Sequence, residues 1–367
     1  MTLYFADIGM NVVDNIESGY HTGLAIKDDL TTDDIDTGVK SFEVYILFDK
    51  ASRQRAITIT EPGCYILKPN VDGCAVYTIV SSELDTSTGE IYVYAEDAGV
   101  DLLNEVVPER KFDNSYNIAW YMNFYAGNGW PGETTGAGWS VGINDIGSGP
   151  TRKLEFTGES TVAERVRSIA KSFDAELSFS VKMSGMNVVG KYINIYKRRG
   201  SDHGTLLRPG KEISGYVVTR DLEQLATGLL ATGSTPEGGN DPINLKTYTG
   251  TVPSGYTLDR NTGILYNNAA RTRWHRELIS TGNIVKTFSY ETASISELFN
   301  RTKAKLDKIC NPSTEISTEL TIYDDTIVCG DTVHIVDTTA DFYADMRIMK
   351  LEKSELNKTI HAEMVKE

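Results

Sequence analysis

The stretch Ile91-Tyr-Val-Tyr-Ala-Glu-Asp-Ala-Gly-Val-Asp-Leu-Leu-Asn-Glu-Val-Val107 changes its hydrophobic period partway along. Up to Ala95 the residues are β-branched and aromatic, which is typical of a strand. After Glu96 the apolar residues recur at helical spacing, at Val100, Leu103, Val106 and Val107. Acidic residues favour the first turn of such a helix, and Pro108 stops it. We therefore expect a β-rich domain to end here and a mixed domain to begin.

Composition limits the class of protein. The chain has 367 residues, 40% of them hydrophobic, and a prior of roughly 150 residues per domain predicts two or three domains. The formal charge of -15 argues against a nucleic-acid-binding surface, which needs clustered Lys and Arg. The densest basic run, Lys197-Arg-Arg199, is interpreted as a solvated strand end. The sequence has no apolar run of 18 residues and no signal-peptide pattern, so we expect no stable membrane insertion and synthesis in the cytoplasm.

Metal and cofactor motifs are absent from the sequence. No two of Cys64, Cys74, Cys310 and Cys329 have the short spacing of a zinc site, so free, mostly buried thiols are expected. The acidic segment 28–36 lacks the ligand spacing and closing Glu of a calcium loop, and an exposed loop is expected instead. We predict no metal, no cofactor and no catalytic residues.

The remaining pattern predicts an α+β, β-rich, multidomain protein. Residues 1–95 contain short β runs separated by turn signals, as in a small β-barrel domain, and residues 96–205 combine helices with a hairpin in an α+β domain. Residues 206–236 and 313–367 form a second, discontinuous β-barrel domain, and 237–312 form an inserted α+β segment. The β runs of the first domain are expected near 41–48, 56–60, 64–68, 75–81 and 90–95.

Helix ends are marked by capping signals. Thr161 and Glu164 form a Thr-x-x-Glu capping box before an apolar stripe, and Ser294 and Glu297 form a second one. A short helix is expected from Ser115 to Tyr125.

Several stretches, in order along nearly the whole chain, resemble the N-terminal region of the siphophage tail-associated lysin family, also called prophage endopeptidase tail proteins. The matching stretches are Tyr94-Ala-Glu-Asp-Ala with Asp101-Leu-Leu, Ala126-Gly-Asn-Gly-Trp130, Thr161-Val-Ala-Glu-Arg-Val-Arg-Ser-Ile-Ala170, Arg199-Gly-Ser-Asp-His-Gly204, Leu225-Ala-Thr-Gly-Leu-Leu-Ala-Thr-Gly233, Asn311-Pro-Ser-Thr-Glu-Ile-Ser and Gly330-Asp-Thr-Val-His-Ile-Val-Asp337. Each is a cap, turn or strand, and the similarity lies in their order and spacing. Residues 240–287 depart from the family pattern.

The resemblance implies a structural hub at the virion tail tip, similar to the central hub of contractile-phage baseplates and of type VI secretion spikes. Such a hub is a homotrimer whose two β-barrel domains per subunit make six similar barrels, which fits a sixfold tail tube to a threefold tip. It implies a distal tail protein, a tape measure protein and receptor-binding or tip proteins as partners, with DNA only in transit. The alternative function is a tail-associated cell-wall-binding or peptidoglycan-degrading protein. The resemblance implies that peptidoglycan cleavage in the family belongs to segments beyond the hub region. A lytic domain could follow in a longer natural chain.

Two His-containing sites were weighed as hydrolase candidates. Asp202 and His203 share a polar turn, and His275 follows Trp274, but neither site has a nucleophile elbow or a metal-binding motif beside it. A non-catalytic role is expected for both sites.

The glycine-rich segment 128–149 carries Trp130 and Trp139. A loop of this composition cannot bury large rings by its own packing. Either both rings fold back on the mixed domain, which is slightly favoured, or they make an inter-subunit contact.

Overall fold

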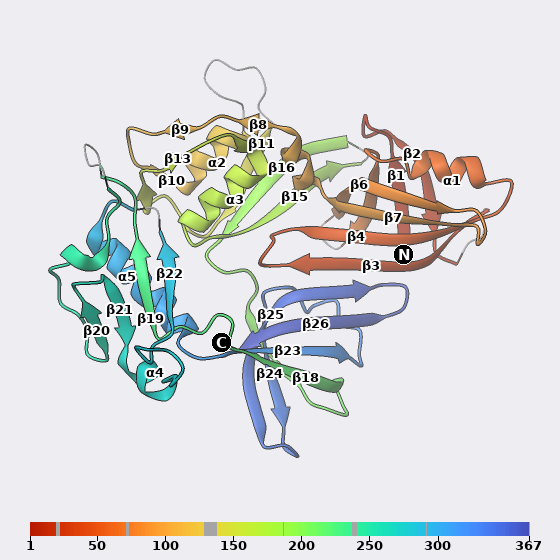
Figure 1. Ribbon diagram of the computed structural model, residues 1–367. Coiled ribbons are helices and arrows are strands. Elements are labelled where there is room, and N and C mark those ends of the chain that lie inside the picture. The colour runs from red at the N-terminus through yellow and green to blue at the C-terminus, as the bar shows by residue number, and fades with distance from the viewer. Residues whose placement is uncertain are drawn as a thin grey trace. The chain divides into compact units, whose positions relative to one another are not determined.

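The structure is a computed structural model, and it describes residues 1–19, 23–70, 73–127, 138–185, 187–236, 241–290 and 292–366 (Figure 1). Strands hold 48% of the residues and helices 17%, which confirms the α+β, β-rich fold class. The chain forms two compact units. Unit 1 comprises Met1–Val217 with Ile316–Val365, and unit 2 comprises Val218–Glu315. In the described part of the chain, no helix has the length and apolar character needed to cross a membrane.

The N-terminal part of unit 1 is a curled antiparallel sheet. Its strands are β1 (Thr2–Ala6), β2 (Val12–Glu17), β3 (Leu24–Asp34), β4 (Lys40–Phe48), β5 (Tyr65–Asn70), β6 (Gly73–Asp85) and β7 (Glu90–Asp97). They lie in the order β3-β4-β7-β6-β5-β1-β2. Alternate residues of β4 face the core, since Phe42, Val44 and Ile46 are fully buried. The strand predicted near residues 41–48 is thereby confirmed.

One predicted strand of this region is a helix. The sequence predicts a strand near residues 56–60, where β-branched residues are frequent, but the structure has α1 (Arg53–Ile59). The buried residues of α1, Ala56 and Ile59, are three positions apart, which is helical spacing. Burial of this face overrides the local β propensity.

The acidic segment 28–36 is mostly strand β3, so the predicted exposed loop was wrong. Asp29 is only 2% exposed. Its carboxylate accepts hydrogen bonds from the Ser354 hydroxyl at 3.0 Å and from two backbone N–H groups just after Ser354, at 2.8 and 3.2 Å. Lys68 Nζ lies 3.4 Å away. A buried carboxylate is tolerated when it is hydrogen-bonded and paired, and these partners lie too far along the sequence to be foreseen.

The stretch after β7 also differs from its prediction. In place of an α-helix to Val107, the chain forms η1 (Ala98–Asn104), a 3-10 helix whose N-cap is Asp97. Its tighter turn changes which residues are buried. Leu102 is fully buried, whereas Leu103 is 39% and Val106 68% exposed. The predicted apolar face was therefore wrong, and the domain boundary predicted here stays a prediction, since both sides of it belong to unit 1.

The mixed part of unit 1 packs two helices, α2 (Ile118–Ala126) and α3 (Val162–Ser172), with the three-stranded sheet β11-β16-β15. The strands are β11 (Trp139–Asn144), β15 (Glu176–Ser184) and β16 (Asn187–Tyr196). β11 lies within the segment predicted as a loop and pairs in parallel with β16. Short strands complete this part: β8 (Val106–Val107), β9 (Arg110–Lys111), β10 (Tyr116–Asn117), β12 (Thr151–Arg152), β13 (Glu155–Phe156) and β14 (Ser160–Thr161).

The predicted capping box of α3 is confirmed. Thr161 Oγ1 accepts the Glu164 N–H at 3.2 Å, and the Glu164 carboxylate accepts the Thr161 N–H at 2.9 Å. These two bonds satisfy donors that the helix itself leaves unpaired.

The C-terminal strands continue the N-terminal sheet. They are β17 (Asp202–Leu207), β18 (Ile213–Asp221), β23 (Ser313–Leu320), β24 (Thr332–Asp337), β25 (Phe342–Ser354) and β26 (Thr359–Lys366). Their order is β18-β23-β26-β25, β24 pairs with β25 and β17, and β25 pairs antiparallel with β3. The two β regions of the sequence are thus joined in one 13-stranded sheet.

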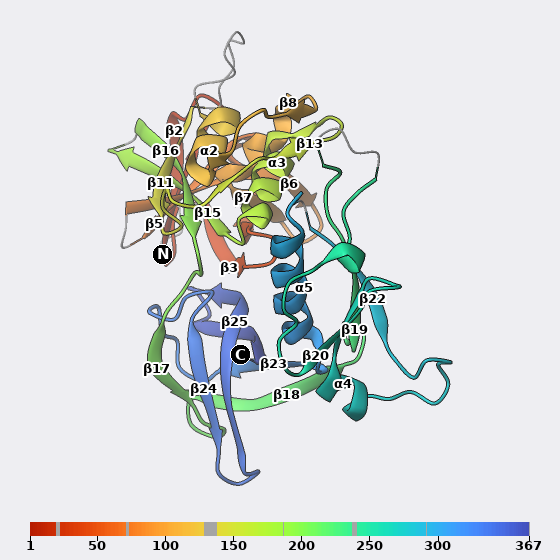
Figure 2. The ribbon, with the colours of Figure 1, turned by 90° about the vertical axis from the view of Figure 1, so that its left-hand side faces the viewer.

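Unit 2 is a small sheet with α5 (Ile295–Ile309) alongside it (Figure 2). Its strands lie in the order β20-β21-β19-β22. Of the capping box predicted at the start of α5, the Ser294 hydroxyl accepts the Glu297 N–H at 3.3 Å, whereas the Glu297 carboxylate accepts the Thr292 hydroxyl at 3.0 Å. The pairing of β19 with β21 and β22 differs from the sequence expectation, which joins these residues to the C-terminal strands. The other elements are β19 (Gly228–Thr232), η2 (Leu245–Thr247), β20 (Tyr256–Asp259), β21 (Ile264–Asn267), α4 (Asn268–Arg273) and β22 (Val285–Ser289).

Replacing the buried carboxylate of β3 tests how strongly it stabilises unit 1. We expect Asp29→Asn to lower the free energy of unfolding by about 3 kcal/mol, because an amide nitrogen cannot accept the backbone hydrogen bonds and Lys68 loses its buried partner. Chemical denaturation at neutral pH measures the change. Glu83→Gln, on an exposed part of β6, is the control and should change stability by less than about 0.5 kcal/mol. Equal effects of the two variants would contradict the assignment.

Candidate functional site

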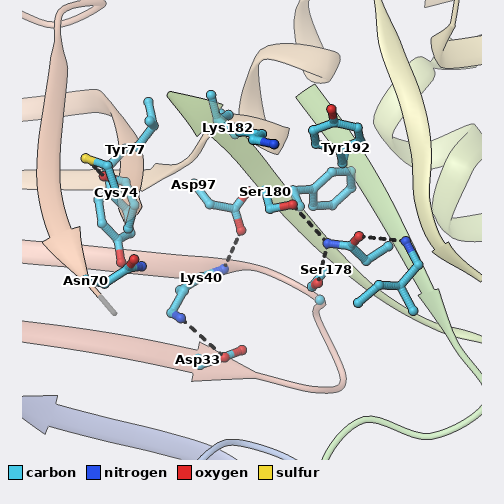
Figure 3. Close-up of a pocket in the computed structure, with 18 of the residues that line it drawn as sticks. Asp33, Lys40, Asn70, Cys74, Tyr77, Asp97, Ser178, Ser180, Lys182 and Tyr192 are labelled. Atoms are coloured by element: carbon cyan, nitrogen blue, oxygen red, sulfur yellow. Dashed lines mark hydrogen bonds and ion pairs between the residues drawn. The ribbon is translucent and has the colours of Figure 1, made fainter. Parts of the chain in front are cut away.

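A pocket of unit 1 lies between the N-terminal sheet and the β15–β16 hairpin (Figure 3). Its volume is about 590 Å³. The hairpin contributes polar side chains, including Ser178, Ser180 and Lys182, and the sheet contributes Asp33 and Lys40. The pocket is therefore polar and carries both signs of charge.

The acidic groups of this pocket are held by neighbouring cations and N–H groups. Arg199 Nη2 lies 3.0 and 2.7 Å from the two carboxylate oxygens of Asp33, and Lys40 Nζ lies 3.8 Å from the same carboxylate. Asp97 accepts the backbone N–H of Lys40 at 2.9 Å and that of Gly99 at 2.9 Å. Burial raises the pKa of Asp97 to about 6, although both backbone hydrogen bonds act in the opposite direction.

Asn194 organises the wall made by the small sheet. It is 8% exposed, its Oδ1 accepts the Ile143 N–H at 3.0 Å, and its Nδ2 donates to Ser180 Oγ at 3.0 Å. A Cβ at Gly142 would lie 2.3 Å from Asn194 Oδ1, so only glycine allows this approach. The side chain of Asn194 thus bonds to groups on both neighbouring strands, β11 and β15.

Beside the pocket, a charged network connects β3, β15 and β25. Arg347 donates to the two oxygens of Glu176 at 2.8 and 2.7 Å, and its Nη2 also donates to the Arg199 carbonyl at 3.1 Å. The Arg199 N–H donates to Glu176 at 2.6 Å. Burial opposes ionisation of Glu176, but the hydrogen bonds from Arg347 and Arg199 bring its pKa below the usual value. We name Asp33, Glu176, Arg199 and Arg347 the junction network.

No local pattern in the sequence predicts the junction network. The run Lys197-Arg-Arg199 is typical of a solvated strand end, but the Arg199 side chain is 13% exposed and paired with Asp33. Arg198 Nη2 donates to Thr332 Oγ1 at 2.6 Å. The interpretation was wrong for Arg199, because its carboxylate partner lies 166 residues away in the sequence.

The first His-containing candidate has a different partner from the one proposed. The Asp202 carboxylate is 3.0 Å from His334 Nε2, and His334 Nδ1 is 2.7 Å from Asp345. These hydrogen bonds raise the pKa of His334. His203 is exposed on the same strand as Asp202. The parallel pairing of β17 with β24 creates this His334 cluster, which no local motif announces.

Unit 2 contains the second candidate. His275 Nε2 lies 3.6 Å from the exposed carboxylate of Glu277, and the ring lines a shallow pocket beside α4. No serine or cysteine lines the described part of that pocket.

The described lining residues of the pocket beside the β15–β16 hairpin include one cysteine and no histidine. Its cysteine, Cys74, is held as a thiol, because burial raises its pKa to about 11. All four cysteines are free, and the described residues hold no cluster of three or more metal-ligating side chains.

Of the two tryptophans in the glycine-rich segment, the structure describes only Trp139. Trp139 is 3% exposed and meets the Phe179 ring edge-on at 5.6 Å, with Lys191 Nζ 5.6 Å from its ring centroid. Trp130 lies outside the described residues. An inter-subunit contact through either tryptophan stays a prediction.

This architecture is a known one among tail proteins, and the whole chain takes part in the similarity. A prophage tail protein gp18 from Listeria monocytogenes EGD-e has a TM-score of 0.63 at 12% identity, covering 100% of this chain and 94% of that one. A 43 kDa tail protein of prophage MuSo2 from Shewanella oneidensis has a TM-score of 0.61 at 11% identity, covering 100% and 98%. A tail protein from Neisseria meningitidis MC58 has 0.59 at 10%, covering 100% and 96%.

These similarities are of fold. No protein-family model matches the sequence, and no curated protein matches it.

The raised pKa of Asp97 predicts a pH dependence of stability. Because the folded-state pKa of about 6 lies above the ordinary value of 3.8, the protonated form stabilises the fold, and this stability is lost as the pH rises through about 6. We expect the free energy of unfolding of Asp97→Asn to rise by about 2 kcal/mol relative to that of the wild type as the pH goes from about 4 to about 7. Denaturation profiles over this range measure the difference. Asp113→Asn, at an exposed site, should run parallel to the wild type, and a parallel Asp97→Asn profile would contradict the prediction.

Proposed function

We propose that this protein is a structural hub of a phage tail tip, without catalytic activity of its own. The observation that carries the proposal is the fold similarity to three tail proteins, which covers the whole of this chain and at least 94% of each of them. A protein that acts as a scaffold needs rigid, interlocked parts. The junction network and the β3–β25 pairing supply such connections within unit 1.

In this proposal three copies form a ring around the tail axis. Each subunit contributes two β regions, so that a trimer presents six similar elements to a sixfold tube and threefold symmetry to the tip. The partners would be a distal tail protein and a tape measure protein on one side and receptor-binding or tip proteins on the other.

The ring would surround a channel through which DNA passes. Inward Lys and Arg would retain phosphates by counterion release, so the wall should be acidic or neutral. Charge is unevenly divided along the sequence. Residues 218–315 contain 11 Lys and Arg and 10 Asp and Glu, so the remaining residues contain 25 and 41. The acidic surplus therefore belongs to unit 1, which is where the proposal requires the channel wall to lie.

The oligomeric state is the first test of the hub. We expect a molar mass in solution of about three times 40.5 kDa by light scattering coupled to size exclusion, because a closed ring needs three copies. The measurement should be repeated over a tenfold range of protein concentration. A monomer throughout this range would contradict the hub and favour a cell-wall-binding tail protein that acts alone.

DNA binding tests the channel separately. We expect no measurable binding of duplex DNA by the trimer at physiological salt, because a conduit must release phosphates readily. Fluorescence anisotropy with a labelled duplex measures this. Tight binding that weakens steeply with salt would exclude the conduit while leaving the trimeric hub intact.

A further inference from the structure

Unit 2 carries a shallow pocket of about 530 Å³ beside α4. Its lining consists only of neutral polar and basic side chains, namely Asn268, Arg271, Thr272, His275, Thr281 and Asn283. Within a chain of net charge -15, residues 268–286 hold four Lys and Arg against one Glu. The Glu277 carboxylate, which lies 3.6 Å from His275 Nε2, is 91% exposed. The residues around this pocket are therefore more basic than the rest of this acidic chain.

Arg271 is held in a fixed orientation. Its Nε donates to Asn283 Oδ1 at 2.9 Å, and its guanidinium lies over the Tyr266 ring at 4.4 Å. The described residues provide no acidic partner for its terminal nitrogens. With Nε bound to Asn283 and one face on the Tyr266 ring, the guanidinium presents its terminal N–H groups side by side. Their spacing matches two oxygens of a phosphate.

The ring of His275 packs against the backbone of Gly282. A Cβ added to Gly282 would lie 1.9 Å from His275 Cε1, so the imidazole packs directly on the backbone there. Gly282 has φ +70°, and its N–H donates to the Ile279 carbonyl at 2.8 Å while its carbonyl accepts the Arg276 N–H at 3.0 Å. These bonds close the loop between Arg276 and Gly282, and the His275 ring lines the same pocket as Arg271.

The other lining groups suit hydroxyls. Asn268 Oδ1 accepts the Thr257 hydroxyl at 2.9 Å, which directs the amide nitrogen of Asn268 to donate elsewhere. The Asn283 amide nitrogen donates to the Thr281 carbonyl at 2.8 Å, which orients Asn283 and keeps its Oδ1 toward Arg271. The hydroxyl of Thr281 lies at the exposed rim, where it can donate or accept.

We propose that this pocket binds a phosphate group carried on a small polyol or sugar. Arg271 and His275 would bind the phosphate, and Asn268 and Thr281 would bind the adjacent hydroxyls. A single guanidinium in a shallow pocket suits one phosphate group better than a duplex, whose binding depends on many phosphate contacts at once. The proposal goes beyond the hub and is independent of it, since the pocket lies within one subunit.

Ligand-observed NMR on the full-length protein tests the site with glycerol 3-phosphate as the probe. With the wild type we expect a saturation-transfer signal on the glycerol protons that reaches a plateau as the concentration of glycerol 3-phosphate increases. Arg271→Gln should weaken binding roughly tenfold, because it removes the charge-assisted bonds. The matched control is Arg273→Gln, which removes the same charge from the same helix. Arg273 stacks on Trp274 and does not line the pocket, so this variant should bind within about twofold of the wild type.

Arg271→Gln also breaks the bond to Asn283, so a second variant is needed. Thr281→Val keeps the Arg271 and Asn283 side chains, removes only the Thr281 hydroxyl, which accepts the Asn283 N–H at 3.4 Å, and should still weaken binding several-fold. Glycerol alone should give no saturable signal, and inorganic phosphate should compete more weakly than glycerol 3-phosphate. The site is overturned if no saturable transfer occurs or if both arginine variants lose binding equally. The polyol is overturned if inorganic phosphate competes equally well or if duplex DNA competes at a lower phosphate concentration at physiological salt. A monomeric protein that still binds would remove the hub and leave this site.

Discussion

The antiparallel pairing of β3 with β25 is the constraint on which the rest of unit 1 depends. It aligns Thr31–Asp34 with Lys350–Lys353 and makes a single sheet out of two regions that are separated by most of the chain. Edge pairing alone does not specify a register, because backbone groups are alike in every strand. Asp29 adds the missing specificity. Its buried carboxylate accepts three donors at and just after Ser354, and a shift of one residue would bury it without those bonds.

The junction network extends the same principle to the mixed part of the unit. Two carboxylates and two guanidiniums lie close together at low exposure, and each charge has a partner of opposite sign within 3.0 Å. Removing one member would leave a partly buried charge without compensation, which costs far more than an exposed pair contributes. The network therefore contributes more to the uniqueness of the arrangement than to its net stability. The neighbouring pocket is polar because these charges and Asp97 line or border it.

The sequence predicts best where the relevant physics is local. The capping box at Thr161 and the N-cap bond of the box predicted at Ser294 each join residues three positions apart, and both are formed. The alternation of β4 is a property of the strand itself. α1 and β3 were predicted wrongly, because burial against distant residues decides both. The same holds for the candidate sites. Asp202 pairs with His334, 132 residues further along the sequence, because β17 pairs with β24, and no local motif encodes this contact. The pocket on unit 2 lies in the segment that departs from the family pattern, where Trp274-His275 was the candidate that the sequence offered.

Charge connects the proposed hub to the proposed phosphate site. Unit 2 is nearly neutral, and its basic residues around α4 face few acids of their own segment. At physiological ionic strength exposed charges are screened beyond about 8 Å, so the donors that line an anion site matter more than the net charge of the chain. The reverse also holds: one guanidinium in unit 2 would not make a conduit in unit 1 adhere to DNA, because retention requires many phosphate contacts along one surface. A chain that repels a polyanion on one unit and binds a single phosphate on another is therefore electrostatically consistent, and the two properties can be removed separately.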